Sequence, residues 1–119
     1  MVNASEEIQK TVSKWKDVTI HSHRFGGIEF RFGRRELGHL HGDSLLDIPF
    51  PLDVKKELIT SGKVQKHHVL PESGWVSFPI HAQQDIEQAV VLLRRSYELA
   101  LYASRRKTGN TQVTTQKEY

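Results

Sequence analysis

The stretch at residues 28–32, Ile-Glu-Phe-Arg-Phe, is the feature that most constrains the fold of this chain. Apolar and charged residues alternate along it, and successive side chains of a β-strand point to opposite faces. Ile28, Phe30 and Phe32 are therefore expected to face a core, while Glu29 and Arg31 face outward. A sheet with one covered and one open face is typical of antiparallel strands, so this stretch predicts such a sheet.

Further strands are expected at residues 18–23, 36–41, 44–48 and 75–80, with a hairpin turn at Gly26-Gly27. Val76, Phe78 and Ile80 of the last strand face the core, and Pro79 marks a sheet edge or the end of the strand. Residues 63–70 fit no single element.

Helices are expected at about residues 4–16, from Pro51 or Leu52 to about Ser61, and at about residues 82–106, because apolar residues recur there at helical spacing. Asn3 is the expected N-cap of the first helix, with Glu6 as its capping-box partner. The order of elements predicts a two-layer α+β domain: a mainly antiparallel sheet of four to five strands, helices packed on one face, and a long C-terminal helix.

The chain of 119 residues is expected to form one domain over residues 1–107, followed by a disordered, polar tail at 108–119. It contains no cysteine, which excludes disulfides, thiol chemistry and cysteine-bound zinc. We find neither a signal peptide nor an apolar run of the ~18 residues that a membrane helix needs. We therefore expect a cytoplasmic protein without a membrane partner.

A compact histidine motif stands at residues 38–44, Gly-His-Leu-His-Gly-Asp-Ser. His39 and His41 are expected on one face of a strand. They can bind a metal with His68 or Asp43, act as acid/base or hydrogen-bonding groups, or support the turn structurally. The spacing after Gly33 resembles half of a cupin signature, but leucines stand where the cupin glutamate belongs. We therefore predict no metal and no cofactor.

The neighbours His67 and His68 are expected to point to opposite sides of the chain, so that at most one joins a site. His21 and His23 share a strand face and are interpreted as surface residues. Nucleotide-binding loops and a nucleophile elbow are absent from the sequence, which removes support for ordinary nucleotide, dinucleotide and hydrolase functions.

Two arginine pairs align on the last expected helix. Arg94-Arg95 and Arg105-Arg106 are eleven residues apart, which is about three helical turns. With a net charge of +3, this stripe can contact phosphates. A solvated helix face is the simpler interpretation, and nucleic acid is not the favoured partner.

Residues 39–44, 51–62, 67–71 and the last helix together resemble the luciferase domain family, which is named after the fungal luciferases. Bacterial members are similar also over residues 23–30 and 73–76, so the resemblance covers roughly residues 21–102. The order of elements is similar to that of the MmcQ/YjbR-like domains. The resemblance implies a small-molecule site, and the fungal enzymes oxidise a hydroxypyrone with molecular oxygen and emit light. It also favours His68 over His67.

We therefore expect a luciferase-like domain that binds a small aromatic or lactone-like molecule and acts as a cofactor-free oxygenase. The expected catalytic residues are His39, His41 and His68, with Asp43 as their positioner. Glu29, Arg31 and Trp75 are expected to bind the ligand. The alternative is a non-enzymatic adaptor for nucleic acid or protein that uses the basic helix face. The sequence leaves a monomer and a homodimer open.

Overall fold

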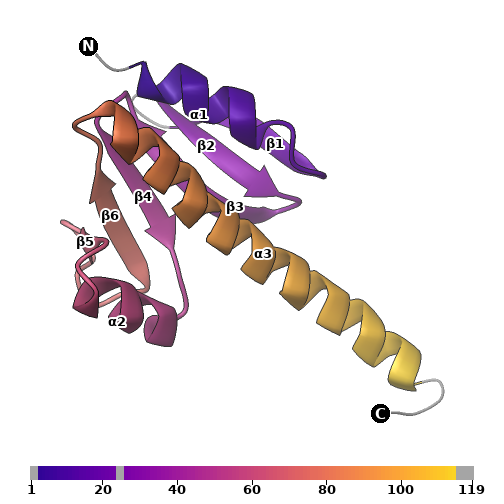
Figure 1. Cartoon of the computed structure of the whole chain (residues 1–119). Coiled ribbons are helices and arrows are strands. Elements are labelled where there is room, and N and C mark those ends of the chain that lie inside the picture. The colour runs from indigo at the N-terminus through magenta and orange to yellow at the C-terminus, as the bar shows by residue number, and fades with distance from the viewer. Residues whose placement is uncertain (1–2, 24–25, 115–119) are drawn as a thin grey trace.

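The computed structural model describes residues 3–23 and 26–114, with side chains described as far as Arg106. Within these residues the elements are α1 (Ala4–Val12), β1 (Val18–His23), β2 (Gly27–Phe32), β3 (Arg35–His41), β4 (Leu45–Pro49), α2 (Leu52–Thr60), β5 (Gln65–Lys66), β6 (Trp75–Pro79) and α3 (Gln83–Thr114) (Figure 1). The predicted α+β class is confirmed.

The six strands form one antiparallel sheet in the order β1-β2-β3-β4-β6-β5. The prediction of four to five strands was one short, because Gln65 and Lys66 pair with Ser77 and Val76. The β1–β2 hairpin is confirmed, although part of its turn lies outside the described residues. Strand β6 ends at Pro79, as one of the two expectations for this proline required.

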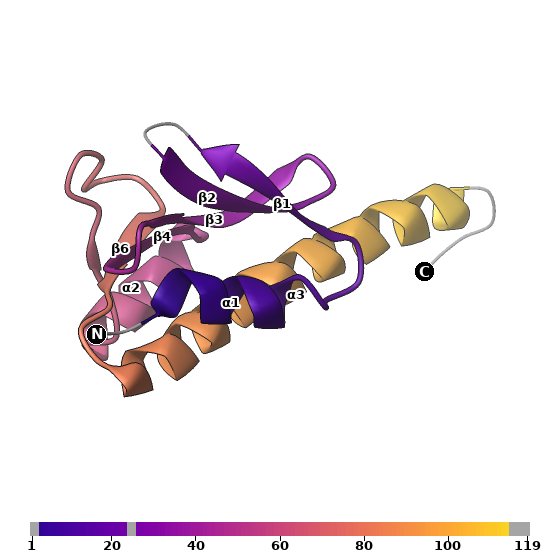
Figure 2. The same ribbon diagram turned by 90° about the horizontal axis from the view of Figure 1, so that it is seen from above.

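Helices α1 and α3 cover one face of the sheet, and the other face carries no helix among the described residues (Figures 1 and 2). The core between the two layers contains Ile8, Phe30, Leu40 and Leu93, all fully buried. In Figure 2 the segment between β5 and β6 rises on the side of the sheet opposite α1 and α3. The alternation in β2 is confirmed, since Phe30 lies in this core and Glu29 lies on the helix-free face.

Gly38 lets α3 approach the centre of the sheet. A Cβ at this position would lie 2.9 Å from Leu93 Cδ2 and 3.0 Å from the backbone oxygen of Asp47. A residue with a side chain would therefore push α3 away from β3. Ser96, also on α3, is buried and donates a hydrogen bond to the backbone oxygen of Leu37 at 2.9 Å, which fixes the helix on the same strand.

The first helix ends earlier than expected, at Val12 rather than near Lys16, and Asp17 takes a left-handed conformation (φ 65°) that leads into β1. The capping box does not form. Asn3 instead donates from its side chain to Glu6 Oε1 at 2.9 Å.

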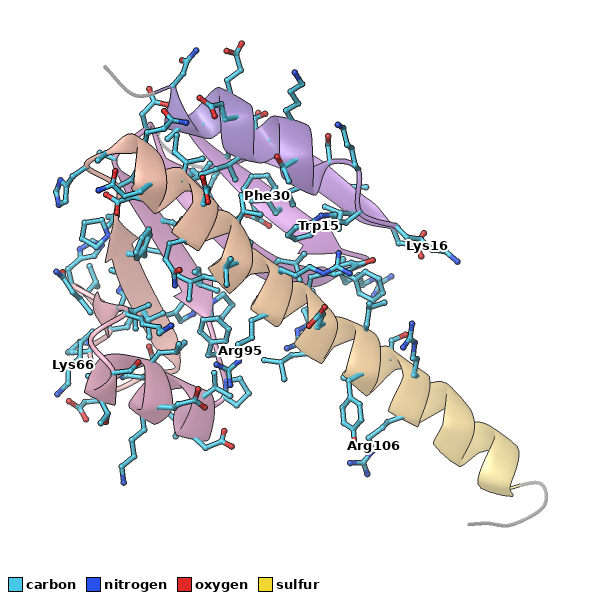
Figure 3. All side chains as sticks on the ribbon, viewed as in Figure 1. Trp15, Lys16, Phe30, Lys66, Arg95 and Arg106 are labelled. Carbon is cyan, nitrogen blue, oxygen red and sulfur yellow. The ribbon has the colours of Figure 1, made fainter. Side chains whose placement is uncertain are left out.

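Helix α3 continues to Thr114, beyond its expected end at Arg106. Its C-terminal half extends past the edge of the sheet, and Figure 3 shows Arg106 on this protruding part. Residues 108–114 of the tail that was expected to be disordered therefore belong to this helix. Residues 115–119 lie outside the described residues, and their disorder stays a prediction. Among the described residues no helix is long and apolar enough to cross a membrane.

Candidate active site

Asp47, in β4, is the centre of the candidate site. Its side chain is fully buried, and its Oδ1 accepts a 2.6 Å hydrogen bond from the hydroxyl of Ser77. Four imidazole Nε2 atoms surround its other oxygen, Oδ2: those of His41 at 2.9 Å, His67 at 3.3 Å, His39 at 3.5 Å and His68 at 3.8 Å. A buried carboxylate among four imidazoles carries a large desolvation cost, which structural roles seldom require.

The register of the sheet places the site residues in one row. Glu29 pairs with His39, His39 with Asp47, and Asp47 with Ser77, across β2, β3, β4 and β6. Directly paired residues project from the same face of a sheet. The row therefore lies on the helix-free face, and His41 stands beside it two residues along β3.

An irregularity in β3 adds Glu36 to this face. The β2–β3 register shifts between Phe30 and Arg31, so that Phe30 pairs with Gly38 and Arg31 with Glu36. In a regular strand residues 36 and 39 point to opposite faces. The bulge brings them together, and Glu36 Oε2 lies 2.6 Å from Nδ1 of His39. A glycine inside a strand is the signal for such a bulge.

His39 lies between two carboxylates. Burial by itself lowers its pKa, but hydrogen bonding to Asp47 and Glu36, together with their negative charges, outweighs burial and raises the pKa from 6.5 to about 9. In the metal-free chain His39 is therefore an imidazolium at neutral pH, with a ring proton directed at each carboxylate.

The pKa of Asp47 moves in the opposite direction. Burial raises it, but hydrogen bonds from His39, Ser77 and His41 prevail and hold the pKa of Asp47 far below its ordinary value. Asp47 is therefore ionised across the physiological pH range.

Both residues of the His67–His68 pair join the site, which corrects the expectation that at most one does so. They lie beyond the end of β5, where the alternation of a strand no longer applies, and their rings stack at 4.5 Å. His68 is the more exposed of the two, and the prediction missed the buried His67. Lys55 of α2 holds the same segment by donating to the backbone oxygens of Pro71 and Ser73, at 2.6 Å each.

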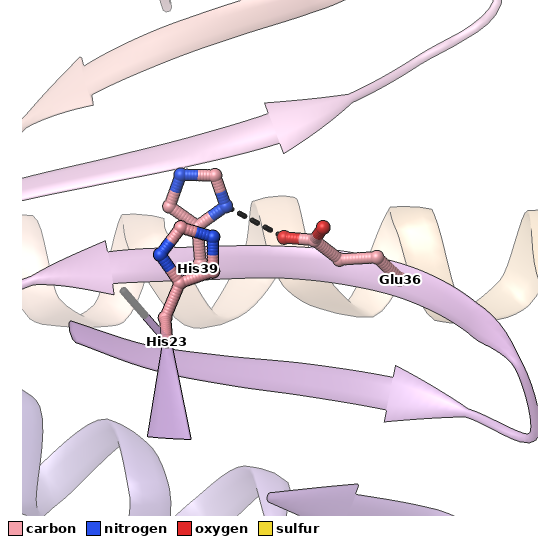
Figure 4. Close-up of side chains that lie close together, drawn as sticks. All are labelled: His23, Glu36 and His39. Carbon is pink, nitrogen blue, oxygen red and sulfur yellow. Dashed lines mark hydrogen bonds and ion pairs between the residues drawn. The ribbon is translucent and has the colours of Figure 1, made fainter. Parts of the chain in front are cut away.

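His23 also belongs to the site and is not the surface residue that we expected. Its ring stacks on that of His39 at 4.1 Å (Figure 4). Its Nε2 lies 3.8 Å from Glu29 Oε1, and its Nδ1 is buried without a hydrogen-bond partner among the described residues. His21 is exposed, as expected, and its ring pairs with the Thr19 hydroxyl at 2.8 Å.

The three expected ligand-binding residues all lie on the helix-free face. Arg31 donates from Nε to the carboxylate of Glu29. Trp75 is half-buried and lies 5.2 Å from the ring of His39 and 6.1 Å from that of His67. It forms an aromatic wall beside the histidines.

Asp43 forms no hydrogen bond or ion pair with the described histidines, and its expected place beside them is taken by Asp47. It lies in the turn after β3 and accepts a 2.8 Å hydrogen bond from the backbone N–H of Ser5, at the start of α1. The sequence signal for Asp47 is its place between Leu46 and Ile48. A charged residue within an apolar strand is rarely fully buried unless it has partners.

The arginines on α3 have local partners. Arg94 pairs with Glu98 at 3.1 Å and lies over the rings of Trp15 and Tyr97, at 5.1 and 4.8 Å from their centres. Arg95 makes two 3.0 Å hydrogen bonds to Glu57 of α2.

Arg106 lies 5.8 Å from the ring centre of Tyr102, and Arg105 is exposed. The glutamate partners of Arg94 and Arg95 therefore offset one end of the stripe, while Arg105 and Arg106 form no ion pair with any residue whose side chain the structure describes.

Two surface pockets have none of the site histidines in their linings. One, of about 560 Å³, lies between α1 and α3 and is lined by Lys10 and Ile86 among others. Another, of about 350 Å³, is lined by residues of α2 together with Lys66 and Pro71. The histidine site therefore belongs to the helix-free face of the sheet, not to either pocket.

The model of the luciferase domain family matches residues 34–96 of this chain. The matched segment runs from the start of β3 into α3 and contains Glu36, His39, His41, Asp47, His67, His68 and Trp75. It is shorter than the resemblance expected over residues 21–102. No curated protein and no solved structure matches the chain. Because the match covers more than half of its 119 residues, the chain belongs to the luciferase domain family.

Proposed function

We propose that the helix-free face binds a small aromatic or lactone-like molecule and that the chain oxidises this molecule with molecular oxygen. The observation that carries the proposal is the gathering of four imidazoles around the buried Asp47, next to the aromatic wall of Trp75. Ionisable groups with strongly shifted pKa values cluster at functional sites.

The exposed members of this cluster provide the contact surface for the ligand. The side chain of His68 is 58% exposed and that of His41 is 41% exposed, so both can donate a hydrogen bond to a hydroxyl or carbonyl oxygen. Trp75 can stack on a flat ring. A flat, oxygen-substituted ring therefore suits the face better than a flexible or aliphatic ligand does.

Binding is tested by titrating hydroxylated benzenes and 2-pyrones against the chain in ligand-observed NMR, and turnover is tested with an oxygen electrode. We expect His68→Ala and Trp75→Ala to weaken binding and His21→Ala, an exposed histidine outside the cluster, to leave it unchanged. Equal binding by all four proteins, or no binding by the wild type, contradicts the proposal.

The adaptor hypothesis has less support, because Arg94 and Arg95 bond to glutamates of the same chain. Its test is electrophoretic mobility of short nucleic acids at low salt, where phosphate contacts are strongest. Binding that disappears in the Arg94→Ala/Arg95→Ala variant favours the adaptor.

A further inference from the structure

We propose that His39, His41 and Asp47 form a binding site for one divalent transition-metal ion. The inference rests on the placement of these three side chains and stands independently of the small-molecule ligand proposed above. It replaces the expectation of a site without metal or cofactor.

The spacing of the donor atoms fits a shared ion. Asp47 Oδ2 lies 2.9 Å from His41 Nε2 and 3.5 Å from His39 Nε2, and one ligand atom from each residue lies within 4.8 Å of the others. Nitrogen and oxygen ligands bind zinc at about 2.0–2.2 Å, so two neighbouring ligands lie about 3.0 Å apart at a right angle and about 3.4 Å apart in a tetrahedron. A metal can therefore contact all three atoms with small adjustments of the side chains.

Hydrogen bonding alone does not explain why four imidazole nitrogens lie near Oδ2 of Asp47. A carboxylate offers about four acceptor positions, shared between its two oxygens. The hydroxyl of Ser77 already uses one on Oδ1. Four imidazole nitrogens face Oδ2, more than the lone pairs of one oxygen can satisfy. A cation bound by His39 and His41 accepts the lone pairs of two of these nitrogens and reduces the mismatch.

The side chains that bond to the proposed metal ligands are of the kind that orient ligands in known metal sites. A metal-bound histidine usually donates its other ring N–H to a carboxylate or a carbonyl group. Glu36 Oε2 lies 2.6 Å from His39 Nδ1 and can accept that proton, which directs the lone pair of Nε2 toward Asp47. Ser77 fixes Asp47 through Oδ1 and leaves Oδ2 for the ion.

A second set of three, Asp47 with His67 and His68, has a similar spacing. His67 argues against it. Its Nδ1 lies 3.1 and 3.0 Å from the backbone N–H groups of Val69 and Leu70 and accepts hydrogen bonds from both. Nδ1 therefore carries no proton, and the ring proton is on Nε2, which lies 3.3 Å from Asp47 Oδ2 and has no free lone pair for a metal.

The donor set selects the class of ion. Calcium and magnesium prefer oxygen ligands, whereas imidazole suits iron, copper, nickel and zinc. Two histidines and one carboxylate form the set of ligands that holds non-haem iron(II) with positions left open for other molecules. His68 and Trp75 border this position, so an oxygen atom of a small molecule could complete the coordination.

The comparison with the cupin signature did not identify this site, because the carboxylate stands at a different position in the sequence. That comparison looked for a glutamate about four residues after His41. The acid is Asp47, six residues after His41 and on the neighbouring strand, where the β3–β4 pairing sets it opposite His39.

The test is direct metal binding to untagged protein, since a histidine tag would compete. The chain is stripped with a chelator and titrated with manganese(II), zinc(II) and, without oxygen, iron(II), and bound metal is counted by mass spectrometry and calorimetry. We expect one ion per chain in the wild type and in the control His21→Gln. We expect His41→Gln to lose the ion while keeping its fold, since the side chain of His41 is 41% exposed.

Glu36→Gln keeps all three ligands and changes only the side chain that bonds to Nδ1 of His39. We expect it to weaken metal binding about 10- to 100-fold. The proposal is overturned if the stripped wild type takes up no ion, if His41→Gln binds as tightly as the wild type, or if His68→Gln abolishes binding and His41→Gln does not.

The same proteins separate this proposal from the proposed function. If the chain takes up a metal ion but binds no aromatic or lactone compound, the metal site is supported and the proposed function is contradicted. If the stripped protein binds those compounds but takes up no ion, the proposed function is supported and the metal site is contradicted.

Discussion

Glu36 Oε2 and His39 Nδ1 lie 2.6 Å apart although a regular β-strand would send their side chains to opposite faces. The bulge at Gly38 makes the contact, and the same glycine admits α3 to the centre of the sheet. One small residue therefore serves the core on one side of β3 and the site on the other.

Gly38→Ala is expected to destabilise the fold. Its new Cβ would stand 2.9 Å from Leu93 Cδ2 and 3.0 Å from the oxygen of Asp47, and overpacking of this kind costs about 1–3 kcal/mol. Urea unfolding measures the loss. The backbone oxygen of Asp47 cannot retreat as a side chain can, so Leu93→Ala should not restore the stability of Gly38→Ala. An unchanged unfolding midpoint in Gly38→Ala would show that α3 has room to move.

The stability of the metal-free chain is expected to fall as the pH rises from about 6.5 to about 9. His39 has a pKa of about 9 in the folded chain against an ordinary value of 6.5, because Glu36 and Asp47 outweigh the effect of burial. Its contribution is complete below the ordinary pKa and is lost as the pH passes the folded value. The rings of His23 and His41 also face it.

Urea unfolding in the presence of a chelator, at several pH values, measures this effect. His39→Gln should lose stability at pH 6 and show a flatter profile between pH 6.5 and 9. As the pH falls below about 4, near the ordinary aspartate pKa of 3.8, both proteins should lose stability, because the folded pKa of Asp47 is far lower than that value. A wild-type profile as flat as that of His39→Gln would contradict the assigned charge of His39.

Lys55→Met is expected to loosen the segment that carries His67. The buried ammonium of Lys55 donates to the backbone oxygens of Pro71 and Ser73, and a hydrogen bond to a charged group contributes about 1.5–3 kcal/mol. Lys56→Met is the matched control, because Lys56 is the exposed neighbour on the same helix.

Hydrogen exchange at the amides of Val69 and Leu70 reports the local effect, since both donate to His67 Nδ1. Exchange there should accelerate in Lys55→Met and not in Lys56→Met. Equal rates in the two variants would mean that the segment is held by other contacts.

Ligand binding is expected to change the fluorescence of one of the two tryptophans. Trp75 lies 5.2 Å from His39, whereas Trp15 packs against Tyr97 on the helical side, with ring centres 5.3 Å apart. Trp75→Phe should remove the change on adding an aromatic ligand, and Trp15→Phe should keep it. A signal that follows Trp15 would place the ligand on the helix side of the sheet.

The fold followed from the sequence because binary patterning is local. The alternation in β2 and the helical spacing in α3 required no knowledge of distant residues, and the same rule placed His39 and His41 together on one face of a strand. The site was harder because it depends on pairing between strands. Nothing near Asp47 in the sequence shows that His39 lies opposite it.

Local irregularities explain the remaining errors. The bulge at Gly38 brings Glu36, which was not among the expected site residues, to the face of His39. The end of β5 removes the alternation that would have separated His67 from His68. Asp43 was chosen for its closeness to His41 in the sequence, whereas the turn directs it to the start of α1.

In strand β4, selection for stability and selection for chemistry favour different residues at position 47. Leu46 and Ile48 point into the core, and Asp47 between them points away from it. Well-packed apolar residues in place of a buried charged pair are often neutral or more stable by about 1–4 kcal/mol. A laboratory selection for folding alone should therefore let Asp47 and His39 drift together toward apolar residues, while a selection that demands chemistry should keep both.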